Sequence, residues 1–331
     1  MQISSQFATS LDSPEHIAVS ESLGYDRAWL QDTPAHSPDV WMMLALAAGR
    51  TKRIGLGPGV LVPTLRHPMV TASGAATLSA LAPGRVAVAF GTGFAGSRAM
   101  GAKPSSWPYL RDYVRSFRGL LQGKTVDWDG GRMRMLHPAG AAPARPIDIP
   151  ILISALGPKG LAVARELGAG LFSVNGETES ARDFTWAALG VHGTVLDEGE
   201  VLDSPRVHVA AGPGNALAYH AAYEFGGDVT RLPAGQVWLD VVNRTPERER
   251  HFVVFDQHLV ALSQADEAAW AAGSWAAIPT TTLTGSAAQL TERLAVIAEQ
   301  GVTEIVYQPT GPDITRELEA FITAARAVLV G

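Results

Sequence analysis

The sequence has no cysteine among its 331 residues. This absence excludes disulfide bonds, thiolate metal sites and a cysteine nucleophile, and it leaves the redox compartment open. Any oxidation or reduction must therefore be carried by a bound cofactor. The nucleophile-elbow pattern of serine hydrolases is also missing, because glycine–serine pairs such as Gly96 and Ser97 lack its second glycine.

Long apolar runs and clusters of basic residues are scarce as well. The longest apolar stretches, such as WMMLALAAG, fall far short of the ~20 residues that cross a bilayer, and MQISSQFATSL lacks the features of a signal peptide. A net charge of -6 argues against a nucleic-acid surface, and the segment RTPERER alternates in sign. We expect a cytoplasmic protein that binds neither membranes nor nucleic acid.

Short strand-like runs alternate with helical patterns along most of the chain. Strands are expected at 3–7, 27–31, 53–62, 86–91, 149–154, 170–174, 207–211 and 304–307. Helices are expected at 14–23, 39–49, 67–81, 109–121, 158–167, 179–196, 286–300 and 314–329. The alternation predicts one α/β domain, 1–331, folded as a (β/α)8 TIM barrel with a helical insertion at about 214–282 before the last strand. An open doubly wound sheet is the main alternative.

The stretch VAVAFGTGFAGSRAMG contains a G-x-G-x-x-G pattern at Gly91, Gly93 and Gly96. A dinucleotide-binding turn requires this pattern after the first strand of its unit, with an acidic residue about 20 positions later. Here the pattern follows the fourth expected strand and leads into a proline-containing loop, so a Rossmann domain is not predicted. Other strand ends, among them Asn175 and Gly176, carry small polar residues, which suits a flat ligand that brings its own chemistry.

The stretch SALGPKG, 154–160, is the best candidate for an anion site. It joins an expected strand to a helix, Gly157 permits close approach, and Pro158 suits the first helical turn. Unpaired amides at the helix N-terminus would face an anion, and Lys159 would add positive charge. An ordinary strand-to-helix turn accounts for the same residues.

Few acid–base residues lie at the expected strand ends. Asp32 ends the second strand, where it could act as an acid or base, or cap a neighbouring turn. His36, His67, His251 and His258 lie near expected loops or in the insertion, and each is a candidate for contacting substrate. No pair has the i, i+4 spacing of a helical metal site, so no metal is predicted.

Five segments, in order along the chain, resemble the luciferase-like family of flavin- or deazaflavin-dependent oxidoreductases. They are ESLGYDRAWLQD, ALAAGRTKRIGLGPGVLVPTLRHP, ATLSALAPGRVAVAFGTG, LISALGPKGLAVARELGAG and GVTEIVYQPTGPD. A co-linear match of this extent is more specific than any single glycine motif. The resemblance implies a TIM barrel with an insertion before the last strand, in agreement with the alternation.

The resemblance also implies a cofactor site. Gly59 and Val60 would form a bulge, often a non-prolyl cis peptide, behind the flavin or deazaflavin ring. Gly91, Thr92 and Gly93 would lie beside the ring. The cofactor phosphate would be bound by Ser154, Ala155, Leu156, Gly157, Pro158 and Lys159.

Within this family, three segments resemble the branch related to methylene-tetrahydromethanopterin reductases, which uses coenzyme F420. They are GTGFAGSRAMGAKP, LLQGKTVDWDG and ERERHFVVFDQHL. We therefore expect coenzyme F420, with FMN as the alternative. Members similar to glucose-6-phosphate dehydrogenases have a histidine and a glutamate where this chain has Thr33 and Phe94, so that activity is not expected. Asp32, His251, His258 or water is left to move the proton.

The expected function is hydride transfer to or from a small organic substrate. An FMN-dependent monooxygenase supplied by a separate reductase and a barrel that binds cofactor without catalysis are the alternatives. The resemblance further implies a homodimer, and it makes a flavin or F420 reductase a candidate partner.

Overall fold

The computed structural model describes residues 1–174 and 178–330, so the expected strand-end residues Asn175 and Gly176 lie outside the described part. Eight strands form its centre: β1 (Gln2–Phe7), β2 (Arg27–Leu30), β3 (Gly55–Pro58), β4 (Val88–Phe90), β7 (Ile151–Ser154), β8 (Gly170–Val174), β9 (Ala187–His192) and β10 (Glu304–Gln308).

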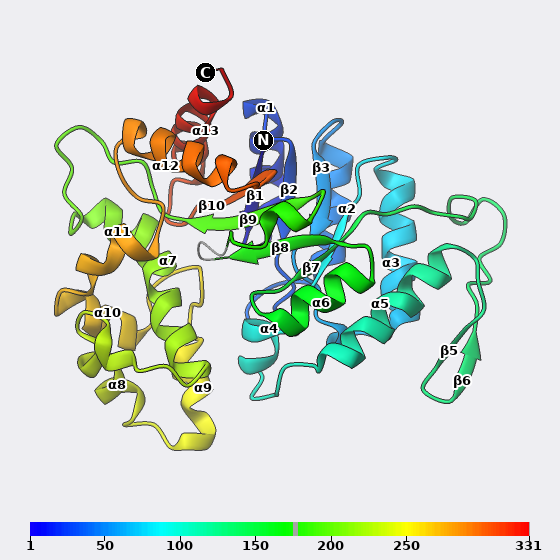
Figure 1. The fold of residues 1–331 in the computed structure, drawn as a ribbon, viewed down its shortest axis with the longest axis horizontal. Helices are drawn as coiled ribbons and strands as arrows, with labels where there is room; N and C mark the ends of the chain where they lie inside the picture. Colours follow the sequence, from blue (N-terminus) through cyan, green and yellow to red (C-terminus); the bar gives the residue numbers. More distant parts are fainter. Residues whose placement is uncertain (175–177, 331) are drawn as a thin grey trace.

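These strands are parallel and follow the order β3-β2-β1-β10-β9-β8-β7-β4. Parallel bridges from Leu56 to Val86 and from Leu61 to Phe90 join β3 to β4, the two ends of that order. The sheet therefore closes into a barrel (Figure 1), which confirms the TIM-barrel prediction and excludes the open sheet.

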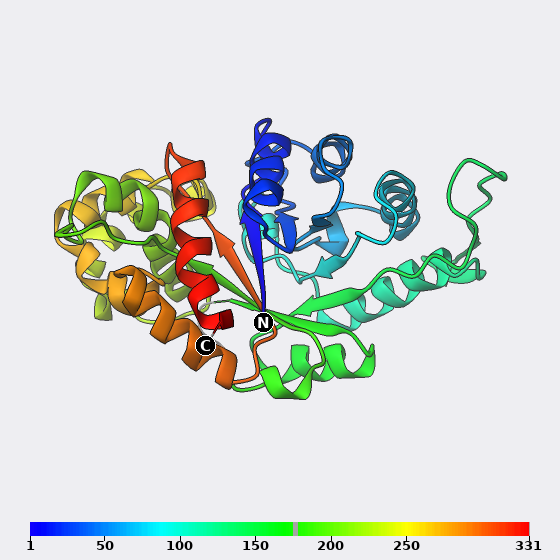
Figure 2. The ribbon, with the colours of Figure 1, turned by 90° about the horizontal axis from the view of Figure 1, so that it is seen from above.

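Helices surround the barrel (Figure 2). They are α1 (Ser13–Leu23), α2 (Val40–Arg50), α3 (Pro68–Leu81), α5 (Trp107–Leu121), α6 (Pro158–Glu166), α12 (Ala287–Glu299) and α13 (Ile314–Val330), with a short α4 (Phe94–Arg98) after β4. The Asp39 side chain caps α2 by accepting hydrogen bonds from the N–H groups of Trp41 (2.9 Å) and Met42 (3.2 Å). In the described part of the chain, no helix combines the length and hydropathy that crossing a bilayer requires.

Side chains fill the inside of the barrel. Trp29 packs edge-on against Phe172, with 5.6 Å between ring centroids. At the amino-terminal end, the buried carboxylate of Glu304 accepts hydrogen bonds from Nε1 of Trp29 (3.0 Å) and Nε1 of Trp186 (2.5 Å). The barrel is therefore a packed core, and a ligand site belongs at the carboxyl ends of its strands.

Two expectations for the seventh strand are wrong. The segment 187–192, expected within a helix at 179–196, is β9 and is buried along its whole length. The segment 207–211, expected to be a strand, lies in the helix α7 (Pro205–Glu224). β9 lacks an alternating pattern because both of its faces are covered. The β-branched residues of 207–211 become helical because the Ser204 side chain caps α7 and tertiary packing outweighs local propensity.

Pro213 and Gly214 lie inside α7, near the point where the sequence placed the start of the insertion. Packing explains the glycine: a Cβ on Gly214 would lie 2.5 Å from Cβ of His192, at the end of β9. The missing side chain lets α7 approach the barrel rim. The seventh strand therefore ends at His192 and not at Gly212, which lies within the helix.

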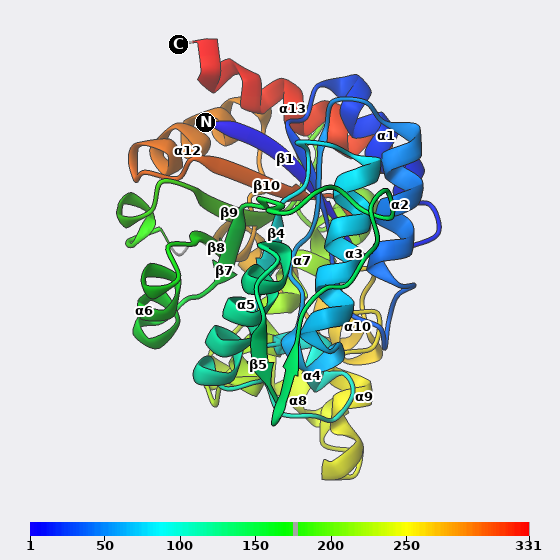
Figure 3. The ribbon, with the colours of Figure 1, turned by 90° about the vertical axis from the view of Figure 1, so that its right-hand side faces the viewer.

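The helices after β9 form a layer beside the barrel, on the left of Figure 1 and at the bottom of Figure 3. They are α7, α8 (Gly235–Val242), α9 (Arg250–Val254), α10 (Gln264–Ala271) and α11 (Ile278–Thr281). Trp238 is fully buried in a hydrophobic cluster that α7, α8, α9 and α10 share. Together they are the insertion of this barrel.

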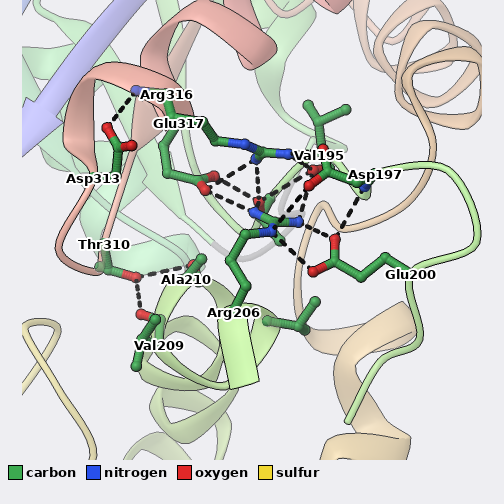
Figure 4. Close-up of polar contacts among 12 residues, drawn as sticks. Val195, Asp197, Glu200, Arg206, Val209, Ala210, Thr310, Asp313, Arg316 and Glu317 are labelled. Carbon is green, nitrogen blue, oxygen red and sulfur yellow. Dashed lines mark hydrogen bonds and ion pairs between the residues drawn. The ribbon is translucent and has the colours of Figure 1, made fainter. Parts of the chain in front are cut away.

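An ion-pair cluster joins the base of the insertion to α13 (Figure 4). Arg206, in the first turn of α7, contacts Glu200, and its Nη1 lies 2.8 Å from Oε1 of Glu317. Arg316 reaches the same Glu317 oxygen at 3.0 Å and Oδ1 of Asp197 at 2.6 Å. Because the Glu317 side chain is 4% exposed, the pairs on it are shielded from solvent more than ordinary surface pairs.

An antiparallel hairpin, β5 (Val126–Trp128) and β6 (Gly131–Met133), projects from the barrel at the front of Figure 3. Its turn residues Asp129 and Gly130 have φ values of 49° and 75°, the left-handed conformations that a two-residue hairpin turn requires.

Candidate functional site

The loops at the carboxyl ends of β1, β2 and β10, together with segment 258–260 of the insertion, surround a cavity of ≈ 440 Å³. Its walls mix apolar and polar groups, among them Phe7, Thr33, His36, His258, Leu259 and Ile314. A cavity of this size and composition accommodates a small organic molecule. We call this part of the barrel mouth the cavity half.

The predicted ring-binding residues meet where β3, β4 and β7 end. The peptide bond between Gly59 and Val60 is cis, as the resemblance implied, and Gln6 Nε2 donates a 2.6 Å hydrogen bond to the Gly59 carbonyl. A Cβ on Gly91 would lie 2.8 Å from Cγ2 of Val60 and 3.4 Å from Cβ of Ser154. Only glycine at this position leaves the surface beside Val60 uncovered.

Thr92 and Gly93 continue the same wall. Gly93 has a φ of 96°, and a Cβ there would lie 2.4 Å from Oγ of Ser97 and 2.7 Å from Cγ1 of Val62. The Thr92 carbonyl accepts a 2.8 Å hydrogen bond from the Ser105 N–H. Conformation and packing both require glycine at 93, so the turn after β4 is held close to the end of β3.

The segment 154–159 leads from β7 into α6. No side chain caps the N-terminus of α6, and Leu156, Pro158 and Lys159 are exposed. A Cβ on Gly157 would meet no atom within 4 Å. Pro158 has no N–H, and the Gly160 N–H donates to the Gly157 carbonyl at 3.1 Å. The open space, the remaining main-chain amides and Lys159 still fit the phosphate of a flavin or deazaflavin cofactor.

The cofactor candidates 59–60, 91–93 and 154–159 do not line the 440 Å³ cavity. The barrel mouth therefore has two parts. We call the part formed by the ends of β3, β4 and β7 the ring half, to distinguish it from the cavity half.

Asp32 is buried at the end of β2 and is paired with Arg66. Nη1 of Arg66 lies 2.5 Å from Oδ2 of Asp32, and Nη2 lies 2.8 Å from Asp39. Burial raises the pKa of the Asp32 carboxyl, and the hydrogen bond and charge of Arg66 offset only part of the rise. One carboxyl oxygen is thus already engaged by a guanidinium, and Asp32 does not line the cavity.

His258 lines the cavity and ends a buried chain of contacts. Its Nδ1 lies 2.8 Å from Nδ1 of His220 in α7, and Nε2 of His220 lies 3.1 Å from Oδ1 of Asp266 in α10. All three side chains are buried. Burial, followed by the charges of His220, His36 and His192, holds the pKa of His258 well below its usual range.

The other three histidines that the sequence analysis proposed as substrate contacts have different surroundings. His251 lies in α9 and does not line the cavity. His36 lines it, with its ring centroid 6.5 Å from that of His258. His67 caps α3, where its Nδ1 accepts a hydrogen bond of 3.2 Å from a first-turn N–H. The fold thus brings His36 and His258 together at the cavity and leaves the other two elsewhere.

Sequence reasoning missed Arg66, His220 and Asp266. Arg66 and His220 had no local signal, because their partners are distant in sequence and α7 was misassigned at 207–211. Asp266 did have a signal: Ser263 and Asp266 have the spacing of a capping box, and the structure contains that box at the start of α10. The spacing locates a helix start but carries no information about the contact with His220.

Phe94 joins the turn after β4 to the insertion. Its ring stacks on Phe225 with 5.0 Å between centroids, and it lies 6.2 Å from the ring of His258. The ion pair of Arg98 and Glu224, at 3.1 Å, crosses the same boundary. Phe94 therefore packs the insertion against the barrel.

A family model described as luciferase-like monooxygenase matches residues 12–304. Among similar sequences, a 5,10-methylenetetrahydromethanopterin reductase of Archaeoglobus fulgidus is 28% identical over 322 residues, covering 92% of this chain and 91% of the relative. An F420-dependent glucose-6-phosphate dehydrogenase of Intrasporangium calvum is 34% identical over 181 residues, which is 49% of this chain and 53% of the relative.

Solved structures with this fold include both deazaflavin and flavin enzymes. The coenzyme F420-dependent tetrahydromethanopterin reductase of Methanopyrus kandleri superposes with a TM-score of 0.68 at 17% identity, covering 99% of each chain. An F420-dependent secondary alcohol dehydrogenase gives 0.65 at 19% identity, covering 99% of this chain and 98% of the other. The oxygenating constituent of 3,6-diketocamphane monooxygenase of Pseudomonas putida, bound to FMN, gives 0.60 at 13% identity and 97% coverage of each.

Proposed function

The chain belongs to the luciferase-like monooxygenase family and is an oxidoreductase, and we propose that it uses coenzyme F420 to transfer hydride to or from a small organic substrate. The match to the A. fulgidus reductase over nearly the whole of both chains supports this branch of the family. The I. calvum relative, named as F420-dependent, supports the cofactor.

The observation that carries the proposal is the convergence of Gly59, Val60, Gly91 and Ser154 in the ring half. Three strands end there without a large side chain over Val60, so a flat ring can lie against backbone. When bound, a deazaflavin supplies a ring carbon that gives or accepts hydride. In this proposal Gln6 holds the Gly59 carbonyl in place, and residues 91–93 border the ring.

The segment 154–159 binds the cofactor phosphate in this proposal. Its first-turn amides are uncapped and Lys159 is exposed beside them, so both a dipole and a full charge attract the anion. Gly157 provides the open space for it.

Substrate occupies the cavity half in this proposal. His16, His36 and His258 line the cavity, and the ring centroids of His36 and His258 lie 6.5 Å apart. We assign the contact with substrate to His258. Asp32 keeps a supporting role beside the ring half because Arg66 already binds its carboxylate. His251 remains a candidate for the entrance of the site and not for its centre, because it does not line the cavity.

Equilibrium titration of the purified apo-protein with coenzyme F420 and with FMN, followed by tryptophan fluorescence, tests the cofactor. We expect F420 to bind at least tenfold more tightly, a difference of about 1.4 kcal/mol. Equal or tighter binding of FMN contradicts the proposal. Oxygen uptake in the presence of reduced FMN then tests for a two-component monooxygenase, the alternative that the FMN-bound structural neighbour favours.

The remaining alternative is a barrel that binds cofactor without catalysing a reaction. Reduction or oxidation of bound F420 by any compound of a substrate panel would exclude this alternative. A cytoplasmic location and supply by a separate reductase stay predictions of the sequence.

We also propose a homodimer formed through α2 and α3. Met42 and Leu46, one turn apart on α2, are 65% and 50% exposed, and Val70 on the neighbouring α3 is 56% exposed. Large apolar side chains exposed together favour burial against another protein surface, and a second copy of this chain presents the same surface.

A further inference from the structure

Asp266 is held in its ionised form by its partners. Trp238 Nε1 donates to it at 2.7 Å, and Ser263 donates through both its N–H (3.0 Å) and its hydroxyl (2.7 Å). Burial raises the pKa of Asp266, but the charge and hydrogen bond of His220 and the hydrogen bonds of Ser263 and Trp238 outweigh it, so the net shift is downward. A buried carboxylate is therefore present next to His220.

That carboxylate determines where the protons of the two histidines lie. An ionised carboxylate only accepts, so the contact at 3.1 Å requires the proton of His220 to be on Nε2. When the His220 ring carries only this proton, its Nδ1 has a lone pair. In that form, a proton on Nδ1 of His258 makes the 2.8 Å contact between the two Nδ1 atoms. Nε2 of neutral His258 consequently has a lone pair.

His258 lines the cavity and lies between two residues in an unusual backbone conformation. Gln257 and Leu259, on either side of His258, have φ values of 55° and 59°, a left-handed conformation that side-chain-bearing residues rarely adopt. Nε2 of Gln308, at the end of β10, donates to the Leu259 carbonyl at 3.3 Å. Among the described residues Nε2 of His258 has no hydrogen-bond partner, yet it is not one of the fully buried polar atoms, so the cavity is accessible to it.

From this geometry we propose that His258 is the proton acceptor for a hydroxyl-bearing substrate in the cavity half, with His220 and Asp266 as positioning residues that receive the charge. The proposal rests on the proposed function and names its substrate class, an alcohol oxidised to a carbonyl compound.

Oxidation of the alcohol moves one proton from the substrate to His258 and a second proton from His258 to His220. The substrate O–H bond breaks and an Nε2–H bond forms on His258, while the Nδ1–H bond of His258 breaks and an Nδ1–H bond forms on His220. With an oxidised deazaflavin bound, the electron pair of the adjacent C–H bond would leave as hydride for it, so that the alcohol would be oxidised and the cofactor reduced. The positive charge would lie on His220, paired with Asp266.

Several ionisable groups face this pair. His36 lies beside His258 from the loop after β2, and His192 faces it from the end of β9. Asp256 lies near His36. Because the base must be unprotonated, kcat/KM for alcohol oxidation should fall at acidic pH, where the histidine pair takes up a proton.

The tautomers can be tested in the unaltered protein. Nitrogen-15 NMR of histidine-labelled apo-protein at neutral pH should show His258 protonated on Nδ1 and His220 on Nε2. A His258 ring protonated on Nε2 overturns the proposal, because it would have no lone pair for the substrate. This measurement needs no cofactor, so its outcome is independent of the proposed function.

The variants His258→Gln and Asp266→Asn test the chemistry with isopropanol and cyclohexanol as probes. His258→Gln should lower kcat about 100-fold, a typical contribution of general base catalysis, while the Kd for coenzyme F420 stays within twofold. Asp266→Asn should lower kcat about tenfold and move the acid limb of the pH profile to lower pH, because the protonated pair loses its counter-ion. A loss confined to KM, or an unshifted acid limb, would mean a structural role only.

His208→Gln is the matched control. His208 also lies on α7 and contacts Glu267 on α10 at 3.0 Å, but this pair is outside the cavity and more exposed. It should leave kcat and the pH profile unchanged. Wild-type protein that binds F420 but oxidises neither alcohol overturns the substrate assignment and leaves the cofactor proposal standing, whereas protein that binds no F420 removes the proposed function itself.

Discussion

Nε2 of Gln6 donates a buried 2.6 Å hydrogen bond to the carbonyl oxygen of Gly59. Gln6 belongs to β1 and Gly59 follows β3, and β2 separates these two strands in the sheet. The bond therefore reaches past the end of β2 and fixes the main chain that forms the back of the ring half.

Gln6→Leu tests this contact. The substitution leaves the buried carbonyl without the donor, which should lower the free energy of unfolding by about 1–3 kcal/mol and weaken binding of coenzyme F420. Urea denaturation and the fluorescence titration measure the two effects. Unchanged cofactor affinity in a destabilised variant would mean that Gln6 supports the fold alone.

Gly91→Ala tests the open surface over Val60. The added Cβ would lie 2.8 Å from Cγ2 of Val60, so a side chain must move into the space proposed for the ring. We expect the Kd for coenzyme F420 to rise at least tenfold, about 1.4 kcal/mol. Gly131→Ala in the hairpin is the control, because its Cβ would meet only one atom, at 3.5 Å. Equal affinity of both variants for coenzyme F420 would contradict binding of the ring against Val60 and Gly91.

Arg66→Met leaves the buried carboxylate of Asp32 without its guanidinium partner. Breaking a buried pair costs about 3–5 kcal/mol of stability at neutral pH. Burial raises the pKa of Asp32 in the folded protein, so the folded state binds more protons than the unfolded state, and the variant should recover stability as the pH falls toward 4, the range in which carboxyls protonate.

The exposed pair of Arg132 and Asp127 in the hairpin provides the control for that measurement. Its atoms lie 3.3 Å apart, with side chains 78% and 83% exposed. Arg132→Met should change the unfolding free energy by less than about 1 kcal/mol. A similar loss in both variants would show that the burial of Asp32 is unimportant.

Glu200→Gln tests the ion-pair cluster of Figure 4. The hydrogen bonds from Arg206, the Asp197 N–H and Ser204, with the charge of Arg206, outweigh burial and lower the pKa of Glu200 from 4.5 to about 2. Because the pKa of Glu200 is lower in the folded protein, ionised Glu200 stabilises the fold at pH values above its unfolded pKa of 4.5. The wild type should therefore be more stable than the variant at neutral pH. This difference should vanish as the pH falls from 4.5 to about 2.

Glu198→Gln serves as the comparison for Glu200, because Glu198 is exposed in the same loop. Thermal unfolding at several pH values should leave its difference from the wild type small and constant. A pH-independent difference for Glu200→Gln would refute the assignment of its stabilising effect to charge.

Leu46→Lys tests the proposed dimer. A charge on the exposed apolar face of α2 should shift the protein toward the 34.9 kDa monomer in sedimentation experiments. Val296→Lys, at another exposed apolar position on α12, should leave the assembly unchanged. A monomeric wild type at micromolar concentration would end the dimer proposal.

The sequence by itself determined the barrel and most of its elements. Seven of the strands and the helices packed on them follow local signals: buried β-rich runs, capping residues such as Asp39 and Ser286, and proline at first turns. The cis peptide between Gly59 and Val60 also agrees with what the family resemblance implied.

Only the tertiary structure decided the seventh strand and the partners of the ionisable groups. Burial on both faces removes the alternation of β9, and packing against His192 permits Gly214 inside a helix, so neither pattern is visible locally. Arg66 reaches Asp32, and His258 reaches His220 and Asp266, across separate elements. Side chains far apart in sequence meet only when the insertion packs on the barrel, and that packing creates the arrangement of protons proposed for the site.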